Sequence, residues 1–295
     1  MKVIEFEDLI DQFAYFLLDA YGVFWGSSET GMLPGAEEMM KRLLSQGKKV
    51  GILSNASQLV SKEKEKLRKH GVEEGTHFHF LLTSGEATRE LLLSRQLPFP
   101  TPKMGYHLFG HLFEPEHPRY SVQALFEGSG FEKRESIEEA DFIYIPVPHL
   151  NGLDQTDPRA FAAQIKEYAT KKVPFLCANP DQYAHEGSPK RLVVRQGTIA
   201  RLLQEQGAEV HFVGKPHPYV YQKALKLFSV EPKEVLMVGD TPETDIRGAK
   251  QVGIATALVT QTGIMRERIE ENGISELSHK DNPDYFIRRF SSHEF

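Results

Sequence analysis

Short apolar runs alternate with amphipathic segments along most of this chain. The runs 14–19 (AYFLLD) and 48–55 (KKVGILSN) are almost continuously apolar, and each is followed by a segment with helical spacing, 34–47 and 57–71. Strands of this kind are typical of a parallel sheet that helices cover on both faces. The pattern predicts an α/β fold with a Rossmann-like, doubly wound parallel sheet.

The alternation is interrupted in the middle of the chain and returns near its end. Strand and helix patterns at 78–96 have counterparts at 208–228 and 234–260, whereas the stretch between them is rich in proline and histidine. That stretch has strand candidates of its own, 141–147 and 173–179. We therefore predict a core domain formed by 1–92 and 190–295, with a smaller α/β domain inserted over 93–189.

Composition excludes several classes of function. The chain has 295 residues, a formal net charge of −6 and a single cysteine, Cys177. An acidic balance argues against a nucleic-acid partner, because phosphate backbones call for a basic face. No segment has the continuous apolar length of a membrane span, and the acid-broken N-terminus does not resemble a signal peptide. We expect a cytoplasmic protein without a membrane or nucleic-acid partner. The sequence leaves the oligomeric state undecided, with a homodimer as one option.

Polar residues stand where the apolar runs end. In an open α/β sheet, ligands bind outside the carboxyl ends of the strands, so these residues are expected at one edge. Alone, each of the carboxylates, the serine and the asparagine could be an ordinary turn or cap residue, and the lysine could be a solvated loop residue. Together, carboxylates, a hydroxyl and a lysine suit phosphoryl transfer with Mg²⁺. The residues are Asp19, Ser54, Asn55, Lys215, Asp240 and Asp245.

Four stretches resemble, in order, the motifs of the haloacid dehalogenase superfamily: DAYGV, LSNAS, GKPHPYVYQKAL and GDTPETDIRGA. The resemblance is closest to the subclass that contains the nitrophenylphosphatase-like, phosphoglycolate and pyridoxal phosphatases. It covers nearly the whole chain, and the inserted segment corresponds to the α/β cap of that subclass. The implied activity is hydrolysis of small phosphorylated metabolites.

The resemblance also implies a role for each motif residue. Asp19 would be the nucleophile and a Mg²⁺ ligand, with Asp240 and Asp245 as further ligands, Asp245 directly or through water. The residue at position 21 would give the metal its main-chain carbonyl.

The phosphoryl group has its own set of residues under the same resemblance. Ser54 would bind it, with Asn55 beside it, and Lys215 would balance the charge of the nucleophile and the phosphate. The implied catalytic residues are thus Asp19, Tyr21, Ser54 and Lys215.

One position departs from the pattern. Phosphatases of the family have a second aspartate where this chain has Tyr21, and that aspartate acts as general acid and base, a contribution of roughly 10²–10⁴-fold. A tyrosine, with a reference pKa of about 10, is a poor base near neutral pH. Three readings follow: a slow phosphatase, a non-catalytic protein that binds a phosphate ligand or regulates, or a haloacid dehalogenase. The acidic fourth motif argues against the dehalogenase.

Overall fold

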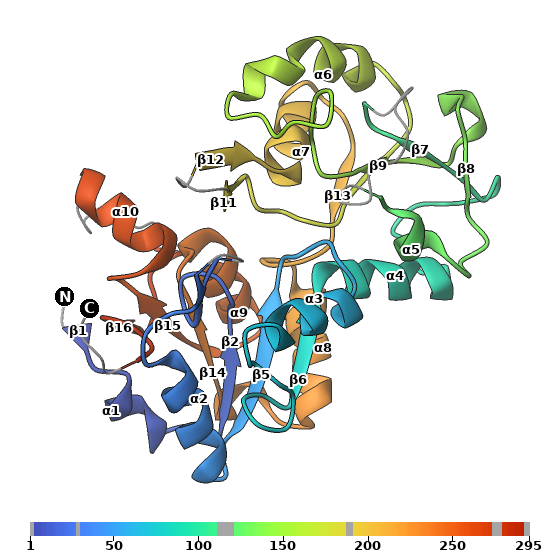
Figure 1. Ribbon diagram of the computed structural model, residues 1–295. Helices are drawn as coiled ribbons and strands as arrows, with labels where there is room; N and C mark the ends of the chain where they lie inside the picture. Colours follow the sequence, from blue (N-terminus) through green and yellow to red (C-terminus); the bar gives the residue numbers. More distant parts are fainter. Residues whose placement is uncertain (1–2, 28–29, 111–120, 187–190, 273–278, 292–295) are drawn as a thin grey trace. The chain divides into compact units, whose positions relative to one another are not determined.

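The computed structural model describes residues 3–27, 30–110, 121–186, 191–272 and 279–291. The chain divides into two compact units, each of which draws on separate stretches of the sequence (Figure 1). The first unit is formed by Met1–Ser54, Val60–Thr83 and Lys215–Phe295, and the second by Asn55–Leu59 and Ser84–Gly214.

The first unit contains a seven-stranded parallel sheet in the order β1-β16-β15-β14-β2-β5-β6. From β2 onward the chain fills this order from the middle outward in two directions, which is the doubly wound arrangement that the sequence predicted, and the short strand β1 is added at the edge beside β16. The strands are β1 (Val3–Ile4), β2 (Tyr15–Leu18), β5 (Lys49–Ser54), β6 (Phe80–Thr83), β14 (Val235–Gly239), β15 (Ala255–Val259) and β16 (Tyr285–Ile287). A short antiparallel hairpin, β3 (Trp25–Ser27) and β4 (Gly31–Met32), follows β2.

Both faces of the central strand β2 are buried, which explains its unbroken apolar sequence. Phe16 and Leu18 point into a core to which α1, α2 and α3 contribute. Leu17 is equally buried and points to the opposite face, because successive strand side chains alternate. The helices of this unit are α1 (Glu7–Ile10), α2 (Ala36–Ser45), α3 (Val60–Arg68), α8 (Pro218–Phe228), α9 (Arg247–Gln251) and α10 (Gly263–Asn272), with a 3₁₀ turn η3 (Pro232–Glu234) and a π-helical turn η4 (Pro242–Ile246).

The second unit has a five-stranded parallel sheet in the order β13-β10-β9-β7-β8 and an antiparallel pair, β11 and β12. Its core gathers apolar residues from the sheet and from α6 and α7. The strands are β7 (Gly105–Leu108), β8 (Glu132–Lys133), β9 (Phe142–Ile145), β10 (Phe175–Cys177), β11 (Tyr183–Glu186), β12 (Arg191–Val194) and β13 (Val210–Phe212). The helices are α4 (Ser84–Ser94), α5 (Gln123–Phe126), α6 (Ala162–Ala169) and α7 (Gln196–Glu205), with 3₁₀ turns η1 (Ile137–Glu139) and η2 (Pro158–Phe161).

The second unit is longer at both ends than the inserted segment expected at 93–189. The sequence placed the strand at 210–212 in the core series, but β13 pairs with β10, from Phe175↔Val210 to Cys177↔Phe212. Because of that pairing and the packing of α7 on α6 and β10, the second unit extends to Gly214. At the other end α4 packs on α5, so the main stretch of the unit begins at Ser84, and Asn55–Leu59 belongs to the unit as well. The apolar pattern of a strand does not by itself indicate which of two sheets the strand joins.

Candidate active site

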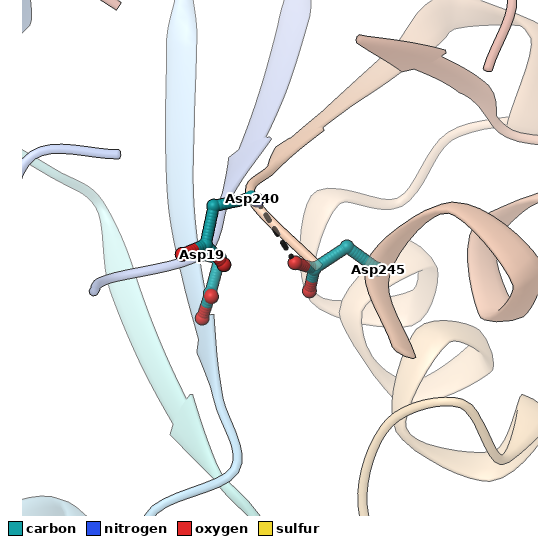
Figure 2. A group of neighbouring side chains, drawn as sticks. All are labelled: Asp19, Asp240 and Asp245. Carbon is teal, nitrogen blue, oxygen red and sulfur yellow. Dashed lines mark hydrogen bonds between the residues drawn. The ribbon is translucent and has the colours of Figure 1, made fainter. Parts of the chain in front are cut away.

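The acidic residues of the first unit meet where neighbouring strands end. Asp19 follows β2 and Asp240 follows β14, and these two strands pair in register from Val235↔Tyr15 to Val238↔Leu18. The Asp19 backbone N–H donates to Val238 O at 2.9 Å, which continues the ladder by one residue. Figure 2 shows the two side chains side by side, with Asp245 facing them from the turn after β14.

Three carboxylates form one cluster. Oxygen atoms of Asp19, Asp240 and Asp245 all lie within 4.8 Å of one another. Asp240 and Asp245 are fully buried or nearly so, and the Asp19 side chain is 13 % exposed. Such a group of oxygen ligands matches the preference of Mg²⁺ for carboxylates, so the residues present fit a divalent cation of this kind.

Lys215 is the positive charge of this cluster. Its Nζ lies 2.5 Å from Asp19 Oδ1 and 2.7 Å from Asp245 Oδ1, and its side chain is 2 % exposed. One lysine faces three carboxylates, and the excess of negative charge has a consequence for their protonation. Burial and then the Asp19 charge raise the pKa of Asp245 to about 7, although Lys215 acts in the opposite direction. Burial and the two neighbouring carboxylates raise the pKa of Asp240 well above its usual range.

Backbone groups hold Asp245 in place. Its Oδ2 accepts hydrogen bonds from the N–H groups of Asp240 at 3.2 Å (dashed in Figure 2) and Thr241 at 3.1 Å. Its own N–H donates to Thr241 O at 2.9 Å. The turn after β14 is therefore closed around this carboxylate, and the other oxygen, Oδ1, is the one that faces Lys215.

Asp240 is held by residues that the sequence reasoning missed. Its Oδ2 accepts from the Ile264 N–H at 2.8 Å and its Oδ1 from the Thr241 hydroxyl at 2.8 Å. Ile264 belongs to the start of α10, where Gly263 has a φ of +66° and where a Cβ would overlap the Asp240 carboxylate. The sequence carries a signal for this contact, because 260–264 (TQTGI) directly follows the apolar run of β15 and so lies at a strand end of the same series.

The segment after Asp19 makes a tight turn beside Asp240. Gly22 has a φ of +73°, and a Cβ there would overlap the Asp240 carboxylate, so only glycine fits. The Thr262 hydroxyl donates to Gly22 O and joins this turn to the end of β15. Tyr21 precedes the glycine, and its main chain forms an isolated β-bridge with that of Trp25. Burial raises the pKa of the Tyr21 hydroxyl further, with smaller effects from Asp240 and Glu267, so the hydroxyl is a weaker acid than that of free tyrosine and keeps its proton near neutral pH.

The two residues of the second motif lie on different sides of the unit boundary. Ser54 is the last residue of β5, which pairs with β2, so it stands at the same edge of the sheet as Asp19. Asn55 is buried in the second unit. Its Nδ2 donates to Asp181 Oδ1 at 2.8 Å, and its Oδ1 accepts from the Ser84 hydroxyl at 3.1 Å. These contacts give Asn55 a structural role, and its expected part in substrate binding stays a prediction.

Comparisons with known proteins agree with this geometry. A model of haloacid dehalogenase-like hydrolases matches residues 16–103, and a second model of HAD-like hydrolases matches residues 212–292. The two matched segments contain all the residues of the acidic cluster and Lys215. The chain belongs to the haloacid dehalogenase-like hydrolases.

Relatives match the chain almost from end to end. A 4-nitrophenylphosphatase of Schizosaccharomyces pombe is 26 % identical over 96 % of this chain and 94 % of its own length. Phosphoglycolate phosphatase 2 of Arabidopsis thaliana is 26 % identical over 97 % of this chain and 94 % of its own. A crystal structure of a haloacid dehalogenase-like hydrolase from Brucella suis covers 98 % of this chain and 99 % of its own, with a TM-score of 0.77 at 21 % identity, and so has the same fold. Among the helices that the structure describes, none is both long and apolar enough to span a lipid bilayer.

Proposed function

We propose that this protein is a Mg²⁺-dependent phosphatase that hydrolyses small phosphorylated metabolites through a phosphoryl group carried on Asp19. The phosphatase class is supported by relatives that match nearly the whole chain and are named for that activity. The observation that carries the mechanism is the position of Asp19, at the end of β2, in contact with Lys215 and beside the buried pair Asp240 and Asp245.

In the first step an Asp19 carboxylate oxygen attacks phosphorus, and the bond from phosphorus to the leaving oxygen breaks while that oxygen takes a proton from solvent. Water then attacks the acyl phosphate, which releases inorganic phosphate and restores the carboxylate. Lys215 Nζ, held beside Asp19, stabilises the negative charge of the transferred group. Ser54, at the end of the adjacent strand β5, donates its hydroxyl to this group in the proposed mechanism.

Asp19, Asp240 and Asp245 would hold the metal, with the main-chain carbonyl of Tyr21. A bound Mg²⁺ would supply positive charge for the phosphoryl oxygens. The geometry supports this assignment, because the three carboxylates lie together and Lys215 contacts two of them.

Turnover is expected to be slow. Position 21 holds a tyrosine, and general acid-base catalysis is worth roughly 10²–10⁴-fold. The same observation favours the second candidate, a non-catalytic protein that binds a phosphate ligand on this scaffold. The expectations of a homodimer and of a cytoplasmic location stay predictions.

The test is phosphate release from a panel of small phosphate esters, measured with and without Mg²⁺ for the natural chain and for Asp19→Asn. Release that requires both the metal and Asp19 would support the phosphatase. Release that survives Asp19→Asn would remove this residue as the nucleophile. Binding of a phosphate ester without any release would favour the non-catalytic candidate.

A further inference from the structure

A buried tyrosine of α8 contacts the turn that carries Asp245. The Tyr221 hydroxyl lies 2.8 Å from the carbonyl oxygen of Thr244 and 3.2 Å from that of Asp245, so its single O–H is shared between them. Tyr221 is fully buried. We infer that Tyr221 is a positioning residue for Asp245 and thereby sets the affinity of the metal site, an inference that rests on the function proposed above.

The local structure explains why the turn needs an external support. η4 is a π-helical turn, and such turns are rare, wider than an α-turn and frequent at functional sites. Within it, Asp245 presents its carboxylate toward Asp19, while its main chain lies over α8. A hydroxyl that donates to two successive carbonyl groups of the turn fixes the distance between the turn and α8.

The sequence makes room for this contact. Gly248, one turn after Asp245, lies against the Tyr221 ring, and a Cβ there would overlap ring atoms and the hydroxyl. Gly248 is buried within α9, where glycine is otherwise unfavourable by roughly 1 kcal/mol relative to alanine. The close approach of the ring to the helix backbone accounts for glycine at this position.

Tyr221 also connects the two charged partners of the cluster. Lys215 lies three residues before the first residue of α8, and Tyr221 is the fourth residue of this helix, so the lysine and the support of Asp245 are close along the chain. The Nζ–Oδ1 distance of 2.7 Å between Lys215 and Asp245 therefore depends on how the turn rests on this helix. Loss of the hydroxyl would let the Asp245 main chain shift and would loosen the carboxylate that the metal needs.

The experiment compares Tyr221→Phe with Tyr219→Phe. Tyr219 lies on the same helix but is 38 % exposed, so it is a matched loss of a hydroxyl outside the buried contact. The dissociation constant of Mn²⁺ alone is measured by titration calorimetry, and the Mg²⁺ dependence of phosphate release is measured in parallel. Removal of a group that orients a metal ligand typically weakens the metal by about 10–100-fold. We expect a rise of about tenfold in the Mn²⁺ dissociation constant for Tyr221→Phe and no change for Tyr219→Phe.

A structural role alone gives a different result. It would lower the melting temperature of Tyr221→Phe and leave the Mn²⁺ dissociation constant of the folded protein as in the parent, which would overturn the inference. Positioning predicts in addition that saturating Mg²⁺ restores most of the maximal rate, and a rate that stays low at saturation would also count against it. Gly248→Ala, which displaces the ring without removing the hydroxyl, should weaken Mn²⁺ in the same direction.

Failure of the proposed function is distinguishable from failure of this inference. Asp245→Asn is the reference variant, since it changes the carboxylate itself. If the parent binds no Mn²⁺, or if Asp245→Asn binds it as well as the parent does, the proposed metal site is wrong and the inference falls with it. If Asp245→Asn weakens Mn²⁺ and Tyr221→Phe does not, only the role of Tyr221 is wrong.

Discussion

The two parallel sheets of this protein have the same architecture but different residues where their strands end. In the seven-stranded sheet, the adjacent strands β2 and β14 lead into Asp19 and Asp240. In the five-stranded sheet, the adjacent strands β9 and β10 lead into Pro146 and Ala178. Ligand sites of open α/β sheets lie at this edge, and of these two strand pairs it is the one in the first sheet that leads into carboxylates.

Buried polar groups are also treated differently in the two units. In the second unit, Asp141 accepts hydrogen bonds from the N–H groups of Lys103 and Gly105, and His107 contacts Arg134 O and the Tyr168 hydroxyl. The polar atoms of these two side chains therefore have hydrogen-bond partners within the second unit. In the first unit, three carboxylates share one lysine, an arrangement that costs free energy without a further cation. The fold is common to both, and the chemistry depends on which polar groups are left concentrated at an edge.

The largest expected effect tests this contrast with one aspartate from each unit. Asp19→Asn should lower phosphate release by about 10³-fold or more, because it removes the proposed nucleophile. Asp141→Asn should leave the rate unchanged and lower the free energy of unfolding by about 1–3 kcal/mol, because it weakens two buried hydrogen bonds. Steady-state kinetics and urea unfolding of both variants measure the two quantities. A rate that falls equally in both would break the contrast.

Two buried cations give a second, smaller test. Lys215→Met leaves the acidic cluster without its lysine, and Arg195→Met removes a side chain, 7 % exposed, that pairs with Asp154 and Glu186 in the second unit. Loss of one partner of a buried pair costs about 3–5 kcal/mol, and we expect both variants to melt earlier. Mg²⁺ should recover part of the loss in Lys215→Met alone, since it can replace positive charge at the cluster.

Thermal melts of both variants with and without Mg²⁺ decide this point. Equal recovery in the two would mean that the ion stabilises the protein without binding at the acidic cluster. No recovery in either would argue that the cluster does not take up the ion once Lys215 is lost.

The sequence predicted the parts of the site that depend on strand ends. Asp19 and Asp240 follow strands with continuous apolar sequence. The carboxyl ends of adjacent parallel strands lie at one edge of the sheet, so such residues meet there independently of the loop conformations. Lys215, after the strand at 210–212, and Asp245, five residues beyond Asp240, were also placed from strand ends, and the motifs then implied their roles. The support of Asp245 by Tyr221 was not predictable from a strand end, because it depends on how closely α8 approaches α9. The same limit applied to β13, whose sheet is decided by pairing and not by local pattern.

A gain of activity is the next effect in size and concerns Tyr21, the position at which the motif resemblance leads us to expect an aspartate. Tyr21→Asp should raise phosphate release by about tenfold or more if the absent acid-base group limits turnover. Tyr21→Phe is the matched control, since it keeps the ring and removes the hydroxyl, and we expect it to change the rate little. Rates for both variants over a range of pH make the measurement. A Tyr21→Asp rate that does not rise would mean that another group already supplies the proton transfer.

The smallest expected effect concerns Cys177, the last residue of β10 in the second sheet. A cysteine thiol can act as a nucleophile, so its reactivity tests the comparison. Its thiol is fully buried at the end of β10 and donates to Asn179 O at 3.2 Å. Burial raises the pKa of the Cys177 thiol to about 12, so almost no thiolate is present near neutral pH and the group is not a nucleophile. Maleimide should therefore label the native protein very slowly and the urea-unfolded protein quickly, with the single thiol as the internal standard. Cys177→Ala should leave phosphate release unchanged. Rapid labelling of the folded chain, or a rate that falls with the thiol, would show that the second sheet contributes a reactive group, and the contrast between the two strand edges would no longer hold.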